Sequence, residues 1–191
     1  MTWFALGKDL PQTKNPVTRF IGRGVFRLMG WQVEGEIPDR SQLVVALVPH
    51  SSNVDFILTI AVLWGLGLRA SFLMKHSLFW FPLGRLLSML GGIPTDRRGP
   101  QGLVGQMTGE FHRHPKLVLG ITPSGTRRSV TEFKEGFARI AAAAQVPVLP
   151  AVLNYQTRTL RFAKLIEDVT NVERIVLAVQ AEAALGMIRT R

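Results

Sequence analysis

Residues 46–56 read ALVPHSSNVDF, where a run of apolar residues that begins at Leu43 stops abruptly at a histidine, small polar residues and an aspartate. A short apolar run bounded by turn residues is typical of a buried strand, and Ser-Ser-Asn is a run of preferred helix N-cap residues. The stretch therefore predicts a strand from Leu43 to Pro49 and a helix from Asn53 to Gly67. His50 is expected in the turn between them.

Short apolar runs and helical patterns continue to alternate along the chain. The expected strands are 69–75, 92–95, 117–122 and 146–153, and the expected helices are 83–90, 102–113 and 133–145. Such alternation predicts an α/β fold with a largely parallel central sheet flanked by helices. Ligands bind at the carboxyl ends of the strands in sheets of this kind. His50 follows one predicted strand end, and Ser124 to Arg127 follow another.

The composition limits both the architecture and the chemistry. With 191 residues the chain is long enough to bury a core, and we expect residues 1–191 to form a single domain. Cysteine is absent, which excludes disulfides, thiolate zinc sites and cysteine nucleophiles. Lys and Arg total 23 against 13 Asp and Glu, a net charge of +10, and this excess favours anionic partners such as phosphate esters, nucleic acid or acidic lipid.

No segment has the pattern of a signal peptide or of a membrane span. The first 16 residues, MTWFALGKDLPQTKNP, lack a basic n-region followed by an uninterrupted apolar region. The longest apolar run, Phe56 to Leu68, would reach only about 20 Å as a helix, which is short of the ~30 Å hydrocarbon core. We expect a cytoplasmic protein, peripheral on the inner face of the membrane.

Residues 16–30 have the pattern of a basic amphipathic helix. Arg19, Arg23 and Arg27 recur every four residues. Beside them, apolar residues follow the spacing of one helical face, at Val17, Phe20, Ile21, Gly24, Val25, Leu28 and Met29. Two interpretations stay open: a helix that packs on the core with a solvated basic edge, and a helix that lies in the interface of an anionic membrane.

His50 and Asp55 together suit general-base catalysis. Asp55 is expected in the first helical turn, where the helix dipole favours a carboxylate. A hydrogen bond from one imidazole nitrogen to Asp55 would fix the tautomer and raise the basicity of the other nitrogen, which can then take a proton from a substrate hydroxyl. A capping aspartate near a histidine also occurs by chance, so the pair alone does not decide the function.

Four sequence blocks together are more specific. In order, the chain carries H-x-x-x-x-D at 50–55, GGIPTDRRG at 91–99, TPSGTRRS at 122–129 and VPVLPAVL at 146–153. Over roughly residues 40 to 155 they resemble the glycerolipid acyltransferase family, typified by 1-acylglycerol-3-phosphate acyltransferases. The resemblance implies an α/β acyltransferase fold. It also implies transfer of a fatty acyl group from a coenzyme A or acyl-carrier-protein thioester to a lysolipid hydroxyl, with His50 as general base and Asp55 as its orienter.

The second and third blocks supply candidate substrate-binding residues: Asp96, Arg97, Ser124, Gly125, Thr126 and Arg127. A glycine lets the backbone approach an anion, and hydroxyl and guanidinium donors can then hold a phosphate. Where the family usually has Glu-Gly-Thr-Arg, this chain has Ser124 in place of the glutamate. The carboxylate expected near the acceptor is therefore missing, which leaves the identity of the acceptor open.

Competing functions have weaker support in the sequence. Ser124 could act as the nucleophile of a serine hydrolase, but the G-x-S-x-G elbow needs a glycine where Thr122 stands. A non-enzymatic module that binds nucleic acid or anionic lipid rests on net charge alone. Aromatic residues interleaved with basic ones are scarce, so we expect no nucleic acid partner. His112 and His114 suit a solvated helix end, and we expect neither a metal nor a cofactor beyond the thioester co-substrate.

Overall fold

The computed structural model describes residues 3–49, 53–95, 102–123 and 133–188. Its helices are α1 (Pro16–Leu28), α2 (Asn53–Leu66), α3 (Leu83–Met89), α4 (Gly102–Arg113), α5 (Gly136–Ala144) and α6 (Val172–Ile188), with a short 3-10 helix, η1 (His76–Leu78). Its strands are β1 (Gln32–Glu34), β2 (Gln42–Val48), β3 (Ala70–Lys75), β4 (Gly92–Thr95), β5 (Leu117–Ile121), β6 (Val148–Asn154) and β7 (Thr159–Phe162).

The strands form one seven-stranded sheet in the order β1-β7-β6-β2-β5-β3-β4. Every neighbouring pair is parallel except β6 and β7, which are antiparallel. The largely parallel α/β architecture predicted from the alternating pattern is therefore confirmed. Each predicted strand and helix from residue 43 to 153 is present, and most of their ends lie within two residues of the predicted ones.

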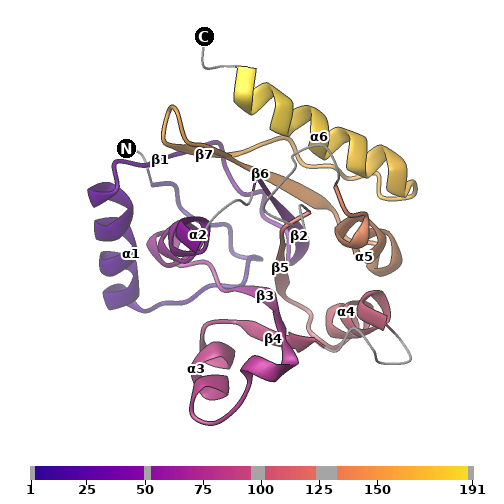
Figure 1. Cartoon of the computed structure of the whole chain (residues 1–191), viewed down its shortest axis with the longest axis horizontal. Helices are drawn as coiled ribbons and strands as arrows, with labels where there is room; N and C mark the ends of the chain where they lie inside the picture. Colours follow the sequence, from indigo (N-terminus) through magenta and orange to yellow (C-terminus); the bar gives the residue numbers. More distant parts are fainter. Residues whose placement is uncertain (1–2, 50–52, 96–101, 124–132, 189–191) are drawn as a thin grey trace.

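The helices cover both faces of the sheet. Figure 1 shows α1 and α2 on one face and α4, α5 and α6 on the other, with α3 beside the edge strand β4. Apolar side chains fill two core clusters, one on each side of the sheet. α2 is apolar on all sides and packs against α1, while Val54, Phe56 and Ile57 near its start are exposed by 42%, 41% and 51%.

Three elements lie outside the predicted set. After the predicted strand 146–153 the structure has two of them, β7 and α6. β1 is only three residues long, and its partner β7 lies more than a hundred residues later in the chain. Local periodicity contains no signal for such a pairing.

α1 packs on α2 through a different face from the apolar stripe seen in the sequence. The buried residues of α1 are Gly22 and Phe26. A Cβ atom on Gly22 would lie 2.5 Å from the Ala61 carbonyl oxygen, so the two helices touch along their backbones there. The predicted stripe is divided: Val17, Phe20, Ile21 and Leu28 are exposed by 61%, 80%, 44% and 88%, whereas Val25 and Met29 pack against the core.

The arginines of α1 are not simply a solvated edge. The Arg23 Nε donates a hydrogen bond to the Gly65 carbonyl oxygen at 2.9 Å, and the guanidinium lies 5.3 Å from the centre of the Trp3 ring. The Nε of Arg19 is buried against the end of α2. α1 therefore packs on the core through Phe26, Val25 and Met29, and Arg23 and Arg27 are exposed beside this contact.

Candidate active site

Four parallel strands end at the same edge of the sheet. β2 ends at Val48, β3 at Lys75, β4 at Thr95 and β5 at Ile121. The three predicted site segments follow the ends of β2, β4 and β5 in the sequence. His50, Asp96, Arg97, Ser124, Gly125, Thr126 and Arg127 lie outside the described residues.

Described residues flank each of these segments. The Thr95 hydroxyl donates to the Met74 carbonyl oxygen at 3.0 Å, which holds the end of β4 to β3. The Lys134 backbone N–H donates to the Pro123 carbonyl oxygen at 2.9 Å, so the two ends of segment 124–132 lie side by side. One of these hydrogen bonds thus joins β4 to β3, and the other joins Lys134 to Pro123 just after β5.

Asp55 lies in the first turn of α2, as predicted, and is completely buried. One turn later on the same helix face, the Thr59 hydroxyl donates to the Asp55 carbonyl oxygen at 2.6 Å. A carboxylate is rarely buried in a protein unless it has polar partners.

A cavity of about 700 Å³ opens beside this helix face and is lined mainly by apolar residues, with Thr59, Ser71, Thr122 and Lys134 as its polar lining. Phe56, Thr59, Ile60 and Leu63 form the wall on the α2 side. The floor comes from sheet residues, among them Val45, Leu47, Phe72, Gly120 and Ala151. Volumes of this size are typical of ligand pockets in proteins. Phe56 and Thr59 line the cavity and are also neighbours of Asp55, so Asp55 lies close to the cavity wall.

The cavity also extends across the sheet to the side of α4 and α5, where Leu103, Phe137 and Ile140 line it. The strand pairing explains how. β3 pairs with β5 only as far as Phe72 and Gly120, whereas β3 continues with β4 to Lys75 and β5 continues with β2 to Ile121. The sheet opens between β3 and β5 at their carboxyl ends, and the cavity passes through that opening.

These cavity residues were not predicted from the sequence. Apolar side chains around a cavity follow the same period as core side chains, so the pattern does not separate them. One signal was present: Gly120 lies inside the strand LVLGI, and a glycine in a strand often marks a place where space is left for something else.

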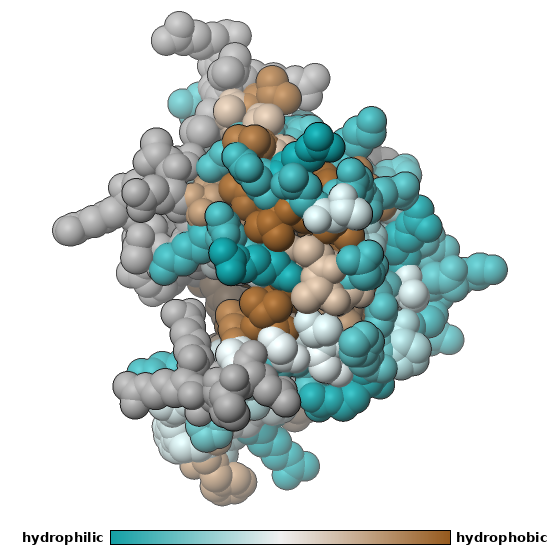
Figure 2. Space-filling model, turned by 90° about the vertical axis from the view of Figure 1, so that its right-hand side faces the viewer, coloured by the Kyte–Doolittle hydropathy of each residue, from teal (hydrophilic) through white to brown (hydrophobic). Residues whose placement is uncertain are grey.

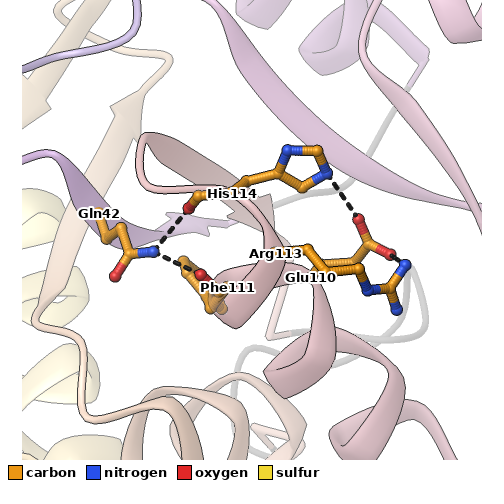
Figure 3. A network of polar contacts seen from close by, with 5 residues as sticks. All are labelled: Gln42, Glu110, Phe111, Arg113 and His114. Atoms are coloured by element: carbon orange, nitrogen blue, oxygen red, sulfur yellow. Dashed lines mark hydrogen bonds and ion pairs between the residues drawn. The ribbon is translucent and has the colours of Figure 1, made fainter.

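His114 lies at the carboxyl end of α4, as expected for a solvated helix end, with 57% of its side chain exposed. Its Nε2 is 3.3 Å from Glu110, which also pairs with Arg113 at 2.8 Å (Figure 3). The Gln42 side-chain amide donates to the carbonyl oxygens of Phe111 and His114 at 2.6 and 2.7 Å and so caps the helix end. In the described residues no three acidic or histidine side chains gather as metal ligands would.

None of the helices in the described parts of the chain is both long enough and apolar enough to cross a bilayer.

Comparison with known proteins identifies the family. The profile of the Acyltransferase family matches residues 31–154, from β1 to the end of β6. The 1-acyl-sn-glycerol-3-phosphate acyltransferase of Limnanthes alba is 28% identical over 112 residues, which cover 54% of this chain and 38% of that protein. The enzyme of the same name from Cocos nucifera is 30% identical over 110 residues, 54% of this chain and 35% of that protein. The matched part thus spans less than two fifths of these plant proteins.

A solved structure agrees on the fold. The crystal structure of the 1-acyl-sn-glycerophosphate acyltransferase PlsC from Thermotoga maritima matches with a TM-score of 0.65 and 18% sequence identity, and the match covers 92% of this chain and 79% of that one. At this identity the likeness shows a common fold. Because the family profile covers well over half of the sequence, this chain belongs to the acyltransferase family.

Proposed function

We propose that the chain transfers a fatty acyl group from an acyl thioester to a hydroxyl of a lysophospholipid. The observation that carries the proposal is the large apolar cavity next to the buried Asp55, in a chain of the acyltransferase family. The relatives from Limnanthes alba and Cocos nucifera are both named 1-acyl-sn-glycerol-3-phosphate acyltransferase. An acyl chain is apolar and flexible, and the size and mainly apolar lining of the cavity suit it.

His50 is proposed as the general base and Asp55 as the residue that orients it. The base takes the proton from the acceptor hydroxyl as its oxygen attacks the thioester carbonyl carbon. The C–S bond then breaks, and the thiol of coenzyme A or of the carrier protein leaves with a proton. A buried carboxylate at the start of α2 suits the orienting role, because removal from water strengthens its hydrogen bonds. No acyl group on cysteine is involved, since the chain has none.

Headgroup recognition is proposed for the segments that follow β4 and β5. Asp96 and Arg97 belong to the first, and Ser124, Gly125, Thr126 and Arg127 to the second. Backbone amides beside a glycine, a hydroxyl and a guanidinium are suitable donors for a phosphate. Serine in place of the family's glutamate changes the charge of this region, and the acceptor is therefore the part of the proposal that most needs measurement.

Membrane association is proposed for α1. Its exposed apolar stripe, Val17, Phe20, Ile21 and Leu28, has no partner in the described residues that covers it, and Arg27 is exposed next to Leu28. An amphipathic helix with basic residues beside an apolar stripe binds anionic interfaces. The buried positions of α1, Gly22 and Phe26, lie on the side opposite these four residues, which leaves the four free to contact lipid.

The proposal is tested with a donor and acceptor panel. The purified chain is incubated with acyl coenzyme A or acyl-carrier-protein thioesters and with lysophosphatidic acid or other lysolipids, and the products are identified by mass spectrometry. We expect one ester to form for each thiol released. Release of free fatty acid without ester formation would favour the serine hydrolase alternative instead.

A further inference from the structure

The segment between β3 and β4 carries a second exposed apolar surface, separate from α1. It consists of Leu78, Trp80, Phe81, Leu86 and Met89, and we call it the α3 patch. Their exposed fractions are 40%, 60%, 84%, 52% and 78%. Five large apolar side chains that are exposed within twelve residues form a cluster, whereas single exposed apolar residues are common on any protein surface.

The residues between and beside the exposed side chains of the patch are packed against the protein. Phe79 turns inward, and a Cβ atom on Gly84 would meet the Phe79 backbone at 2.7 Å, so the start of α3 is pressed against this turn. Gly84 and Leu87 are buried against the sheet edge, while Leu86 and Met89 lie one turn apart on the outer face of α3. The exposed side chains are therefore presented by an anchored turn and helix. Figure 1 shows α3 at the edge of the molecule beyond β4.

The formal charges within the patch segment have one sign. Lys75 and Arg85 are exposed in it. The sequence contains no Asp or Glu from residue 56 to 95, a stretch that includes the whole patch. Tryptophan and phenylalanine are favoured at the level of lipid headgroups, and each nearby basic residue adds attraction to anionic lipid. An exposed aromatic and basic surface therefore suits an anionic bilayer better than it suits a basic protein partner, whose charges would repel it.

The position of the patch relates it to the cavity. Phe72, Leu73 and Met74 of β3 line the cavity, and the patch segment begins immediately after β3 with Lys75. A bilayer in contact with the patch would thus lie next to the end of β3, whose residues line the cavity. By contrast, the face formed by α4, α5 and α6 is largely hydrophilic, with hydrophobic residues visible only between polar ones (Figure 2).

We propose that the α3 patch inserts into the interface of an anionic membrane and holds the cavity opening at the lipid surface. The proposal rests on the proposed function for the identity of the lipid substrates, but not for the binding itself. It adds a second membrane contact to that of α1. Insertion places Trp80 and Phe81 among the headgroups and acyl chain ends, with Lys75 and Arg85 beside the anionic headgroups.

The first measurement is vesicle binding by the full chain without either substrate. Phe81→Ser/Met89→Ser removes the two most exposed members of the patch, and Leu177→Ser/Leu185→Ser on α6, exposed by 55% and 53%, is the matched control. On vesicles of phosphatidylglycerol and phosphatidylcholine we expect about a tenfold or greater loss of partitioning for the patch variant and little change for the control. Equal binding by the patch variant and the unmodified chain would overturn the proposal.

The second measurement locates Trp80 and does not depend on a disruptive change. Vesicles that contain brominated lipid quench tryptophan fluorescence only where the ring reaches the bilayer. We expect quenching in the unmodified chain and loss of most of it in Trp80→Phe, which retains an apolar ring and most of the binding. Quenching that persists in Trp80→Phe would place another tryptophan in the bilayer and contradict the proposal.

Two further measurements distinguish membrane binding from self-association and from catalysis. Sedimentation velocity without lipid tests whether the patch joins two copies of the chain. Suppose that the unmodified chain is a dimer, and that Phe81→Ser/Met89→Ser converts it to a monomer without changing vesicle binding. The patch would then be a dimer interface, and the membrane proposal would be overturned. Acyl transfer in detergent micelles tests the proposed function separately. We expect the patch variant to keep its micellar activity and to lose activity on vesicle-embedded acceptor. Absence of any acyl transfer, with patch-dependent vesicle binding, would remove the proposed function and leave this inference standing.

Discussion

At the scale of single residues, Asp55 is the best-defined member of the candidate site. The aspartate is buried, lies in the first turn of α2, and shares a helix face with Thr59, which lines the cavity. His50, the proposed base, stands five residues earlier in the sequence and lies outside the described residues. The residue type of Asp55, its position on the helix and its burial all agree with the proposed orienting role.

We predict that His50→Ala reduces acyl transfer by about a hundred- to ten-thousand-fold, the usual contribution of a general base. Asp55→Asn should cost less, because it disturbs only the orientation and basicity of the imidazole. Initial rates with saturating donor, together with circular dichroism to check folding, measure both effects. A well-folded His50→Ala protein with full activity would end the proposed acyltransferase mechanism.

We also predict that Ser124 sets acceptor preference. Without the family's carboxylate, Arg127 and Arg128 are less neutralised, and we expect low activity on lysophosphatidic acid and higher activity on another lysolipid with a free hydroxyl. Ser124→Glu should shift the preference towards lysophosphatidic acid. An acceptor panel with one donor, assayed for both proteins, measures the shift. Equally high activity of the unmodified chain on lysophosphatidic acid would show that the serine is neutral.

At the scale of elements, the contact between α1 and α2 depends on a glycine. A Cβ atom on Gly22 would lie 2.5 Å from the Ala61 carbonyl oxygen and 2.5 Å from the Gly65 nitrogen, both backbone atoms that yield only if the helices separate. Gly24 is two residues away on the same helix, and a Cβ atom there would meet nothing within 4 Å. The two positions form a natural pair for comparison.

We predict opposite effects of alanine at these glycines. Gly22→Ala should lower the free energy of unfolding by about 1–3 kcal/mol, the usual cost of forcing extra atoms into a packed contact. Gly24→Ala should raise it by about 0.5–1 kcal/mol, because alanine has less freedom than glycine in the unfolded chain. Urea denaturation followed by circular dichroism measures both. Equal effects at the two positions would mean that α1 does not pack on α2 through Gly22.

The outward stripe of α1 leads to a prediction about membranes. Phe20→Ser/Leu28→Ser should weaken sedimentation with phosphatidylglycerol vesicles, and Arg27→Gln should weaken it by up to about 1 kcal/mol. Arg23→Gln is expected to affect folding as well, because the Arg23 side chain contacts Gly65 and Trp3. The control is Leu177→Ser/Leu185→Ser on α6. Unchanged sedimentation of the Phe20→Ser/Leu28→Ser variant would mean that the stripe has a purely structural role.

At the scale of the whole molecule, the sequence predicts the order of elements well between residues 43 and 153. The reason is that turn residues and hydrophobic period are local signals. The ends of α2, β3 and α4 can therefore be predicted from the residues at those ends. β1 and β7 were missed because short strands that pair across most of the chain have no local signature. For α1 the sequence left two interpretations open, because an apolar stripe has the same pattern whether it packs on protein or on lipid.

The candidate site was predicted in part. His50 and Asp55 follow from residue types at a strand end and a helix start, and Asp55 lies in the predicted turn of α2. The cavity was not predicted, since it arises where β3 and β5 part and where α2 stands away from the sheet. Such a space depends on how elements pack at a distance, and no window of sequence contains it. Only Gly120 marked its floor.

That glycine gives the last prediction. Val118 of β5 packs in the core on the α2 side, and alternation along the strand points position 120 to the same side, between Val45 and Phe72. A Cβ atom at Gly120 would meet only the Ser71 carbonyl oxygen at 3.7 Å, an ordinary contact, so larger residues fit the backbone. Their side chains would instead enter the cavity and shorten the path proposed for the acyl chain.

We therefore expect the series Gly120→Ala, Gly120→Val and Gly120→Leu to shift donor preference stepwise towards shorter acyl chains. Each methylene that no longer fits costs about 0.8 kcal/mol of apolar burial, or roughly fourfold in kcat/KM. The measurement is kcat/KM for a ladder of donor chain lengths with one acceptor. Short donors should keep their rates, because their chains stop before position 120. A uniform loss at every chain length would indicate damage to the fold, and an unchanged profile would mean that the acyl chain does not enter the cavity at all.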